Sequence, residues 1–236
     1  EKFDPKVYIP TITGYYSTSK GEMLSLPFNS STAVMYYNKD AFRKAGLDPE
    51  KPPVTWPEFF ETAKKLKASG MEGGFSTNWI SWIQLENFSA WHNQSFGTKN
   101  NGFDGLDTTL VFNTPLTVKH FETIYELSKD KTFIYGGREN KANPLFTSGT
   151  VGMHFESIGG YGNFKNTCKF EFGVSRLPYY PDVKGAPQNS IIGGASLWVF
   201  NGKPKDDYKG VAKFFTFLSQ PESQAFWHQT TGYVPI

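Results

Sequence analysis

The stretch AVMYYNKDAF, residues 33–42, changes from an apolar run to a polar helix start at Asn38. A short apolar run is typical of a buried strand, and Asn is a preferred residue at the start of a helix. Two further runs of this character, at residues 151–155 and 196–200, predict two more buried strands. A strand that passes directly into a helix is the repeating unit of an α/β sheet.

Four helices are marked by their first residues. Thr55-Trp56-Pro57-Glu58 has the sequence of a capping box, in which the Thr and Glu side chains bond backbone N–H groups at the helix start. Thr114-Pro115 predicts a second helix, whose buried face should consist of Val118, Phe121, Ile124 and Tyr125. Helices should also begin near Asp206 and at Pro221, the latter ending at Gly232. Strands alternating with helices predict an α/β fold.

Composition excludes several classes of protein. Aromatic residues make up 17% of the 236 residues and charged residues 19%, so the chain has enough apolar surface to fold rather than stay disordered. The net charge is +2 without a cluster of basic residues, which argues against nucleic acid as a partner. The one cysteine, Cys168, excludes a disulfide within the chain.

Catalytic and metal-binding patterns are weak. The four histidines are far apart in the sequence and lack the spacing of metal ligands, so we expect neither a metal nor another cofactor. Glu86 and Glu156 are candidates for the paired carboxylates of a glycosidase, although a cap or surface role is more common for each.

A tryptophan cluster is more informative. Trp79, Trp82 and Trp91 lie close together in the sequence, interleaved with Asn and Gln side chains. On a helix, Trp79 and Trp82 would share a face. Indole rings beside amides suit a polyol, because the rings cover C–H groups while the amides bond hydroxyls. A buried core would give the same pattern, and so would a lectin or glycan-active enzyme.

Longer strings carry a resemblance to a known family. They are LPFNSST (26–32), YYNKDAF (36–42), WIQLENFSAW (82–91), APQN (186–189), IIGGASLW (191–198), WHQ (227–229) and TGY (231–233). The chain resembles the family-1 extracellular solute-binding proteins over its whole length. It is most similar to those that capture glycerol 3-phosphate in the periplasm for an ATP-driven (ABC) uptake system.

The resemblance implies a two-lobed α/β fold of the periplasmic-binding-protein type, like that of maltose-binding protein. Residues 1–33 would end the first part of lobe one and 34–186 would form lobe two. Residues 187–236 would return to lobe one. The family's members extend beyond both ends of this chain, so it would be an internal portion, and an Arg that binds phosphate would lie past Ile236.

The resemblance also implies a function without catalysis. Glycerol 3-phosphate, or a glycerophosphodiester such as glycerophosphocholine, would bind between the lobes of a monomer and pass to a membrane permease in the periplasm. A sugar is the alternative ligand. The implied ligand contacts are Ser31, Trp79, Trp82, Ser157, Gly194 and Tyr233. A carboxylate at Glu156 would repel a nearby phosphate.

Overall fold

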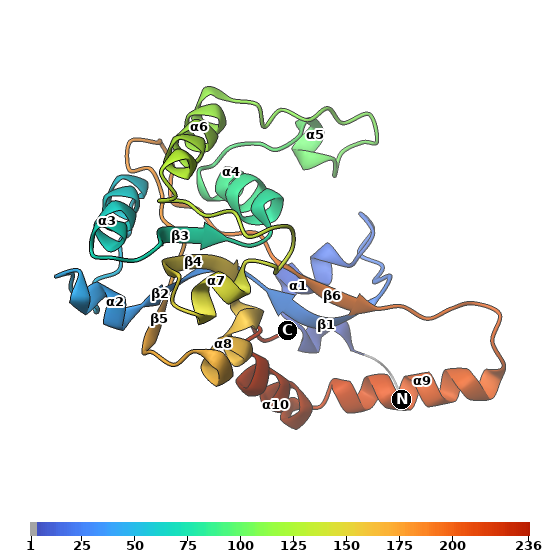
Figure 1. Cartoon of the computed structure of the whole chain (residues 1–236). Helices are drawn as coiled ribbons and strands as arrows, with labels where there is room; N and C mark the ends of the chain where they lie inside the picture. The colour runs from blue at the N-terminus through green and yellow to red at the C-terminus, as the bar shows by residue number, and fades with distance from the viewer. Residues whose placement is uncertain (1–3) are drawn as a thin grey trace. The chain divides into compact units, whose positions relative to one another are not determined.

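The computed structural model describes residues 4–236, which divide into two compact units (Figure 1). Unit 1 contains the described residues up to Thr32, together with Ile158–Gly162 and Ile192–Ile236. Unit 2 contains Ala33–Ser157 and Asn163–Ile191. The predicted lobes, 1–33, 34–186 and 187–236, stay a prediction, and residues 1–3 lie outside the described part of the chain.

Unit 1 is built on a pair of antiparallel strands. In this pair β1 (Leu26–Ser31) runs against β6 (Gly193–Leu197), with Leu26 opposite Leu197. The helical elements of this unit are a 3₁₀ turn at Pro5–Val7, α1 (Pro10–Tyr15), a 3₁₀ turn at Ile158–Gly160, α9 (Lys205–Leu218) and α10 (Pro221–Thr231). The predicted end of α10 is confirmed, since Gly232 adopts a left-handed conformation with φ +87°.

The predicted strand at residues 196–200 is wrong in its position. The observed strand, β6, begins earlier and ends at Leu197, because its register is set by pairing with β1. The apolar residues that suggested a later strand, Trp198 and Phe200, are 65% and 81% exposed.

Unit 2 contains a four-stranded sheet in the order β3-β4-β2-β5. Strand β4 pairs parallel with β3 and antiparallel with β2, and β2 pairs antiparallel with β5. The strands are β2 (Ala33–Asn38), β3 (Gly73–Thr77), β4 (Val151–Ser157) and β5 (Phe172–Ser175). The helices are α2 (Lys39–Lys44), α3 (Trp56–Ala68), the π-helical turn Trp82–Asn87, α4 (Phe88–Trp91), α5 (Thr98–Asn101), α6 (Pro115–Lys129), α7 (Asn143–Thr147) and α8 (Tyr161–Thr167), the last of which begins in unit 1.

Helix α3 forms where its capping box predicts. The Thr55 hydroxyl accepts a hydrogen bond from the N–H of Glu58, whose carboxylate accepts one from the N–H of Thr55. The helix lies so close to β3 that a Cβ on Gly74 would collide with the backbone of Ala63. Its buried side chains join the main hydrophobic core with Phe75 and Phe155 of the sheet. The predicted start and buried face of this helix are therefore confirmed.

Helix α6 begins where predicted but buries a different face. Ile124 is buried, whereas Val118 and Tyr125 are 42% and 62% exposed. The core position is taken by His120, whose ring stacks on Phe88 at a centroid distance of 4.1 Å. A histidine was not counted as a core residue, so the predicted face is rotated around the helix.

The opposite side of the sheet in unit 2 is covered by α7 and α8. Phe146 of α7 and Phe164 of α8 both pack against Tyr36 of β2. The segment that carries Trp79 follows Thr77, the last residue of β3. It lies next to the end of β4, where the Asn78 N–H donates to the Phe155 carbonyl. Within residues 4–236, no helix combines the length and the apolar character needed to cross a bilayer.

Candidate ligand-binding site

Trp79 stands two residues after β3, before the helical turns that contain Trp82. Its backbone N–H donates to the carbonyl of Glu139 at 3.0 Å, and its carbonyl accepts from Ile83 at 2.8 Å. Its φ is +43°, a conformation that costs a bulky residue about 1–3 kcal/mol. The ring is 40% exposed, so it is neither core nor fully solvated. The backbone is thus held in a strained conformation that presents a half-exposed indole.

A buried carboxylate is bonded to Asn78, the residue before Trp79. Glu156 of β4 is 3% exposed, and its carboxylate accepts hydrogen bonds from the Ser157 N–H at 2.6 Å and from the Asn78 side chain. Burial raises the pKa of Glu156, and its hydrogen-bond donors act in the opposite direction by stabilising the carboxylate. Glu156 therefore links the end of β4 to the segment after β3.

Asn78 forms hydrogen bonds through both its backbone and its side chain. Its backbone N–H donates to the carbonyl of Phe155 at 2.9 Å, and its side-chain oxygen accepts from Ala142 N–H at 2.9 Å. Its amide group donates to Glu156 and to Asn143 Oδ1, the latter at 2.7 Å. In the sequence, Asn78 is one of the Asn and Gln side chains that are interleaved with the tryptophans. Its position directly after a buried strand was the available signal.

Trp82 and Ser157 complete the expected residues of unit 2. Trp82 is partly buried and packs against the hydrophobic core. The helix that would place Trp79 and Trp82 on one face begins only after Trp79, so that prediction is wrong. Ser157 ends β4, and its carbonyl accepts a hydrogen bond from the Tyr36 hydroxyl at 3.1 Å. Glu156 accepts hydrogen bonds from the Ser157 N–H and from Asn78, the residue before Trp79, so it connects these two segments.

The other three expected residues, Ser31, Gly194 and Tyr233, belong to unit 1. Ser31 is the buried last residue of β1 and stands opposite Gly193, the neighbour of Gly194. On the other side of β1, Val234 forms a bridge to Ser30 with an N–H to carbonyl distance of 3.0 Å. Tyr233 therefore lies beside the same end of β1, so the fold brings these three residues together.

Tyr233 packs on the glycine turn that follows β4. A Cβ on Gly159 would lie 2.6 Å from the Tyr233 ring, so only glycine admits the ring there. The Tyr233 carbonyl is hydrogen-bonded to His228 Nδ1, and its N–H donates to the Thr231 hydroxyl at 3.3 Å. Packing on Gly159 therefore holds the Tyr233 ring, and two hydrogen bonds hold the Tyr233 backbone.

Gly194 has a structural reason to be glycine. Its φ is +120°, and a Cβ at this position would collide with the carbonyl of Asn29 in β1. The Asn29 side chain also crosses to β6, where its Oδ1 accepts the Ala195 N–H at 2.9 Å. The backbone of the neighbouring strand therefore approaches Gly194 so closely that only glycine fits there.

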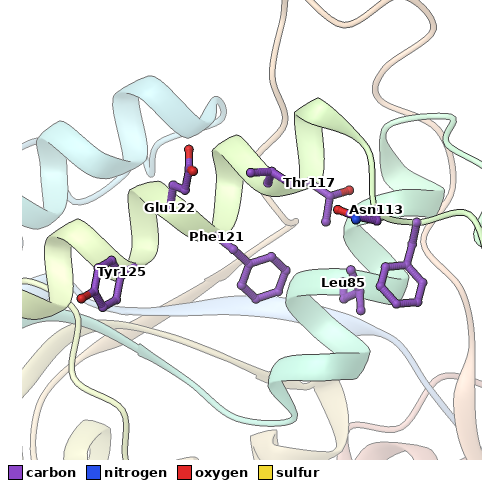
Figure 2. Close-up of a pocket in the computed structure, with 8 residues that line it drawn as sticks. Leu85, Asn113, Thr117, Phe121, Glu122 and Tyr125 are labelled. Carbon is purple, nitrogen blue, oxygen red and sulfur yellow. The ribbon is translucent and has the colours of Figure 1, made fainter.

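An open apolar groove also occurs in unit 2 (Figure 2). It has a volume of about 430 Å³ and lies between α6 and the turn that carries Leu85. The residues lining it are Leu85, Phe112, Asn113, Thr117, Val118, Phe121, Glu122 and Tyr125. None of the six expected ligand contacts is among them. Three α6 residues that were predicted to face the core, Val118, Phe121 and Tyr125, line this groove, whereas Ile124 is buried.

The buried histidines of unit 2 are structural. His154 is fully buried and hydrogen-bonded to Ser76 and Asn143, and burial lowers its pKa to about 3. Burial also lowers the pKa of His120 well below its usual value. Among residues 4–236, no three His, Cys, Asp or Glu side chains gather closely enough to hold a metal ion.

Known proteins resemble this chain over its whole length. The sequence profile of the bacterial extracellular solute-binding proteins matches residues 1–236. The sn-glycerol-3-phosphate-binding periplasmic protein UgpB of Escherichia coli (strain K12) is 55% identical over 236 residues, which are 100% of this chain and 54% of that protein. Its counterpart in Salmonella typhimurium is 54% identical over 99% of this chain and 54% of its own length.

Solved structures show the same architecture. The crystal structure of UgpB from Mycobacterium tuberculosis in complex with glycerophosphocholine has a TM-score of 0.81 and 25% identity, covering 99% of this chain and 58% of that one. Maltose-bound MalE3 of T. maritima has a TM-score of 0.80 and 20% identity, covering 98% of this chain and 58% of that one. The predicted α/β fold of the maltose-binding-protein type is confirmed.

This chain spans about half the length of the curated relatives that it matches. The match to the family profile nevertheless covers every residue of it. The chain belongs to the bacterial extracellular solute-binding proteins.

Proposed function

We propose that this protein captures glycerol 3-phosphate, or a glycerophosphodiester such as glycerophosphocholine, in the periplasm. It would deliver the ligand to the membrane permease of an ABC transporter without altering it. One observation carries the proposal: the 55% identity to a glycerol-3-phosphate-binding periplasmic protein extends over all 236 residues. The likeness to a structure in complex with glycerophosphocholine supports the wider ligand class.

The six proposed ligand contacts have suitable chemistry. The half-exposed indole of Trp79 offers an apolar face to the glycerol carbons. The hydroxyl groups of Ser31, Ser157 and Tyr233 and the backbone N–H of Gly194 are donors for phosphate and hydroxyl oxygens. Trp82 would contribute through its partly buried ring. No catalytic group is required for this role.

Because the ligand is small, tight binding requires a high binding free energy per atom. Micromolar binding corresponds to about −8.2 kcal/mol, or roughly 0.8 kcal/mol for each of the about ten non-hydrogen atoms of glycerol 3-phosphate. This efficiency lies below the limit of about 1.5 kcal/mol per atom for small ligands. It requires contacts on nearly every side of the ligand, which the two lobes of a solute-binding protein supply when they close.

Calorimetry on the full-length protein tests the proposal with three ligands: glycerol 3-phosphate, glycerophosphocholine and maltose. We expect micromolar binding of at least one phosphate compound and no heat from maltose. Binding of maltose alone would favour the sugar-binding alternative. Incubation with glycerophosphocholine, followed by phosphorus NMR, should show no product, whereas turnover would identify an enzyme.

A matched pair of variants connects the binding to Trp79. Trp79→Ala should weaken the affinity for the phosphate ligand, because it removes the apolar face of the site. Tyr125→Ala removes another exposed aromatic ring in unit 2, 62% exposed and on α6, and should leave the affinity unchanged. Equal effects of the two variants would remove Trp79 from the proposed site.

A further inference from the structure

We propose that Asn78 is a positioning residue, which holds the backbone bend that presents Trp79 to the ligand. This inference rests on the proposed function, since it assigns a role within the same site. Asn78 lies between Thr77, the last residue of β3, and Trp79, and it is fully buried. It therefore acts on the ligand through the residue that follows it, and not by contact.

Both ends of the Asn78 amide have partners, which fixes its orientation. Oδ1 accepts from the Ala142 N–H at 2.9 Å, while Nδ2 donates to Asn143 Oδ1 at 2.7 Å and to the Glu156 carboxylate. An amide turned over would place its oxygen against two other oxygens and its NH₂ group against an N–H. A leucine of the same shape would lose every one of these bonds, and an aspartate would lose the donor.

The partners of Asn78 belong to two different elements. Glu156 is part of β4, and Phe155 of the same strand accepts the Asn78 backbone N–H at 2.9 Å. Ala142 and Asn143 form the start of α7. Asn78 thus ties the end of β3 to β4 and to α7 at the residue directly before Trp79. Because all these groups are buried or part-buried, their hydrogen bonds are shielded from competition by water.

The bend at Trp79 needs such support. Its φ is +43°, and its N–H donates at 3.0 Å to the carbonyl of Glu139, whose own φ is +54°. Positive φ values in residues other than glycine persist where the surrounding structure enforces them, and such residues gather at functional sites. The Trp79 ring is 40% exposed, so its burial cannot supply that support. Asn78 supplies it by bonding to Ala142, three residues after Glu139.

A double-mutant cycle tests whether Asn78 acts through Trp79. Affinity for glycerol 3-phosphate and for glycerophosphocholine is measured by calorimetry in the full-length protein for Asn78→Ala, Trp79→Ala and the double variant. We expect each single variant to weaken binding about tenfold, and the double variant to bind about as weakly as Trp79→Ala, because the ring that Asn78 positions is already absent. Additive losses of binding free energy, or unchanged affinity in either single variant, would overturn the proposal.

An isosteric substitution and its rescue give a readout that general destabilisation would not. Asn78→Asp keeps the acceptor for Ala142 but places an oxygen against the Glu156 carboxylate, so binding should weaken. Adding Glu156→Gln supplies an NH₂ group that can donate to the new carboxylate. The double variant should therefore bind more tightly than Asn78→Asp alone. Binding that is no tighter would contradict the proposed role of the side-chain donor.

A further readout uses no ligand. The indole N–H resonance of Trp79, identified by its absence in Trp79→Ala, should shift in Asn78→Ala because the bend is released. An unshifted resonance would overturn the proposal even if binding changed. Absence of phosphate-ligand binding by the unmodified protein would overturn the proposed function, while the resonance would still report on positioning.

Asn38 provides a matched control. It is also a buried asparagine at the end of a strand in the same sheet, and its Oδ1 accepts the Ala41 N–H at 2.8 Å at the start of α2. Asn38→Ala should lower stability, but it should change neither the Trp79 resonance nor the affinity of the folded molecules. If Asn38→Ala weakens binding as much as Asn78→Ala does, the effect at Asn78 is general destabilisation and the proposal is wrong.

Discussion

Lowering the pH from 7 to 5 should destabilise unit 2 by about 2 kcal/mol through one residue, His154. Its ring is fully buried in β4 and stacks on Phe146 at a centroid distance of 5.7 Å. Nδ1 lies 2.7 Å from the Ser76 hydroxyl and Nε2 lies 3.2 Å from Asn143 Oδ1. These partners suit a neutral ring that accepts at Nδ1 and donates at Nε2.

The size and sign of the effect follow from the pKa of His154. Burial lowers it from 6.5 to about 3 in the folded protein. As the pH falls below 6.5, the unfolded chain binds a proton that the folded chain excludes, so stability is lost until the pH reaches the folded pKa. Each pH unit in this window costs about 1.4 kcal/mol, which gives roughly 2 kcal/mol at pH 5.

Urea unfolding at pH 7 and pH 5 measures this loss. His92 and His120 also have lowered pKa values and contribute to the same trend, so the informative quantity is a difference between proteins. His154→Gln, which cannot titrate, should lose about 2 kcal/mol less than the unmodified protein between the two pH values. Equal losses in the two proteins would refute the assignment of this effect to His154.

Three further predictions concern stability. Gly194→Val should destabilise unit 1 by about 1–3 kcal/mol, because the new Cβ collides with β1. Gly210→Ala, which has open space around it, should leave the stability unchanged, and thermal unfolding compares the two variants. Trp82→Ala should lower stability more than Trp79→Ala, because Trp82 packs on the core; equal unfolding midpoints would contradict this. Thr55→Ala should cost about 1 kcal/mol in urea unfolding by removing the cap of α3, and an unchanged midpoint would show that the cap contributes nothing.

Features set by neighbouring residues could be predicted from the sequence. The capping box at Thr55 and the glycine at 232 act within one turn of their own helices, and both were placed correctly. The family resemblance supplied the fold as a whole. The buried face of α6 could not be predicted, because it depends on His120 meeting Phe88 and Gln84 from another part of the chain.

The candidate site shows the same division. The sequence grouped the tryptophans but could not show that Trp79 has a positive φ, or that the helix begins only after it. Glu156 was considered as a glycosidase carboxylate, as a cap or surface residue, and as a charge that would repel phosphate. Its hydrogen bond to Asn78 arises from the pairing of β3 with β4, a contact between residues far apart in the sequence.

The pairing of β1 with β6 has a consequence for synthesis. Leu26 and Leu197 are partners in this pair, and at ~5–20 residues per second a ribosome needs roughly 10–35 s to make the chain between them. Strands β2, β3 and β4 emerge during that interval and can pair with one another. Strand β1, although made before them, lacks its partner β6 while the sheet of unit 2 assembles. A strand edge without its partner is open to pairing with other chains.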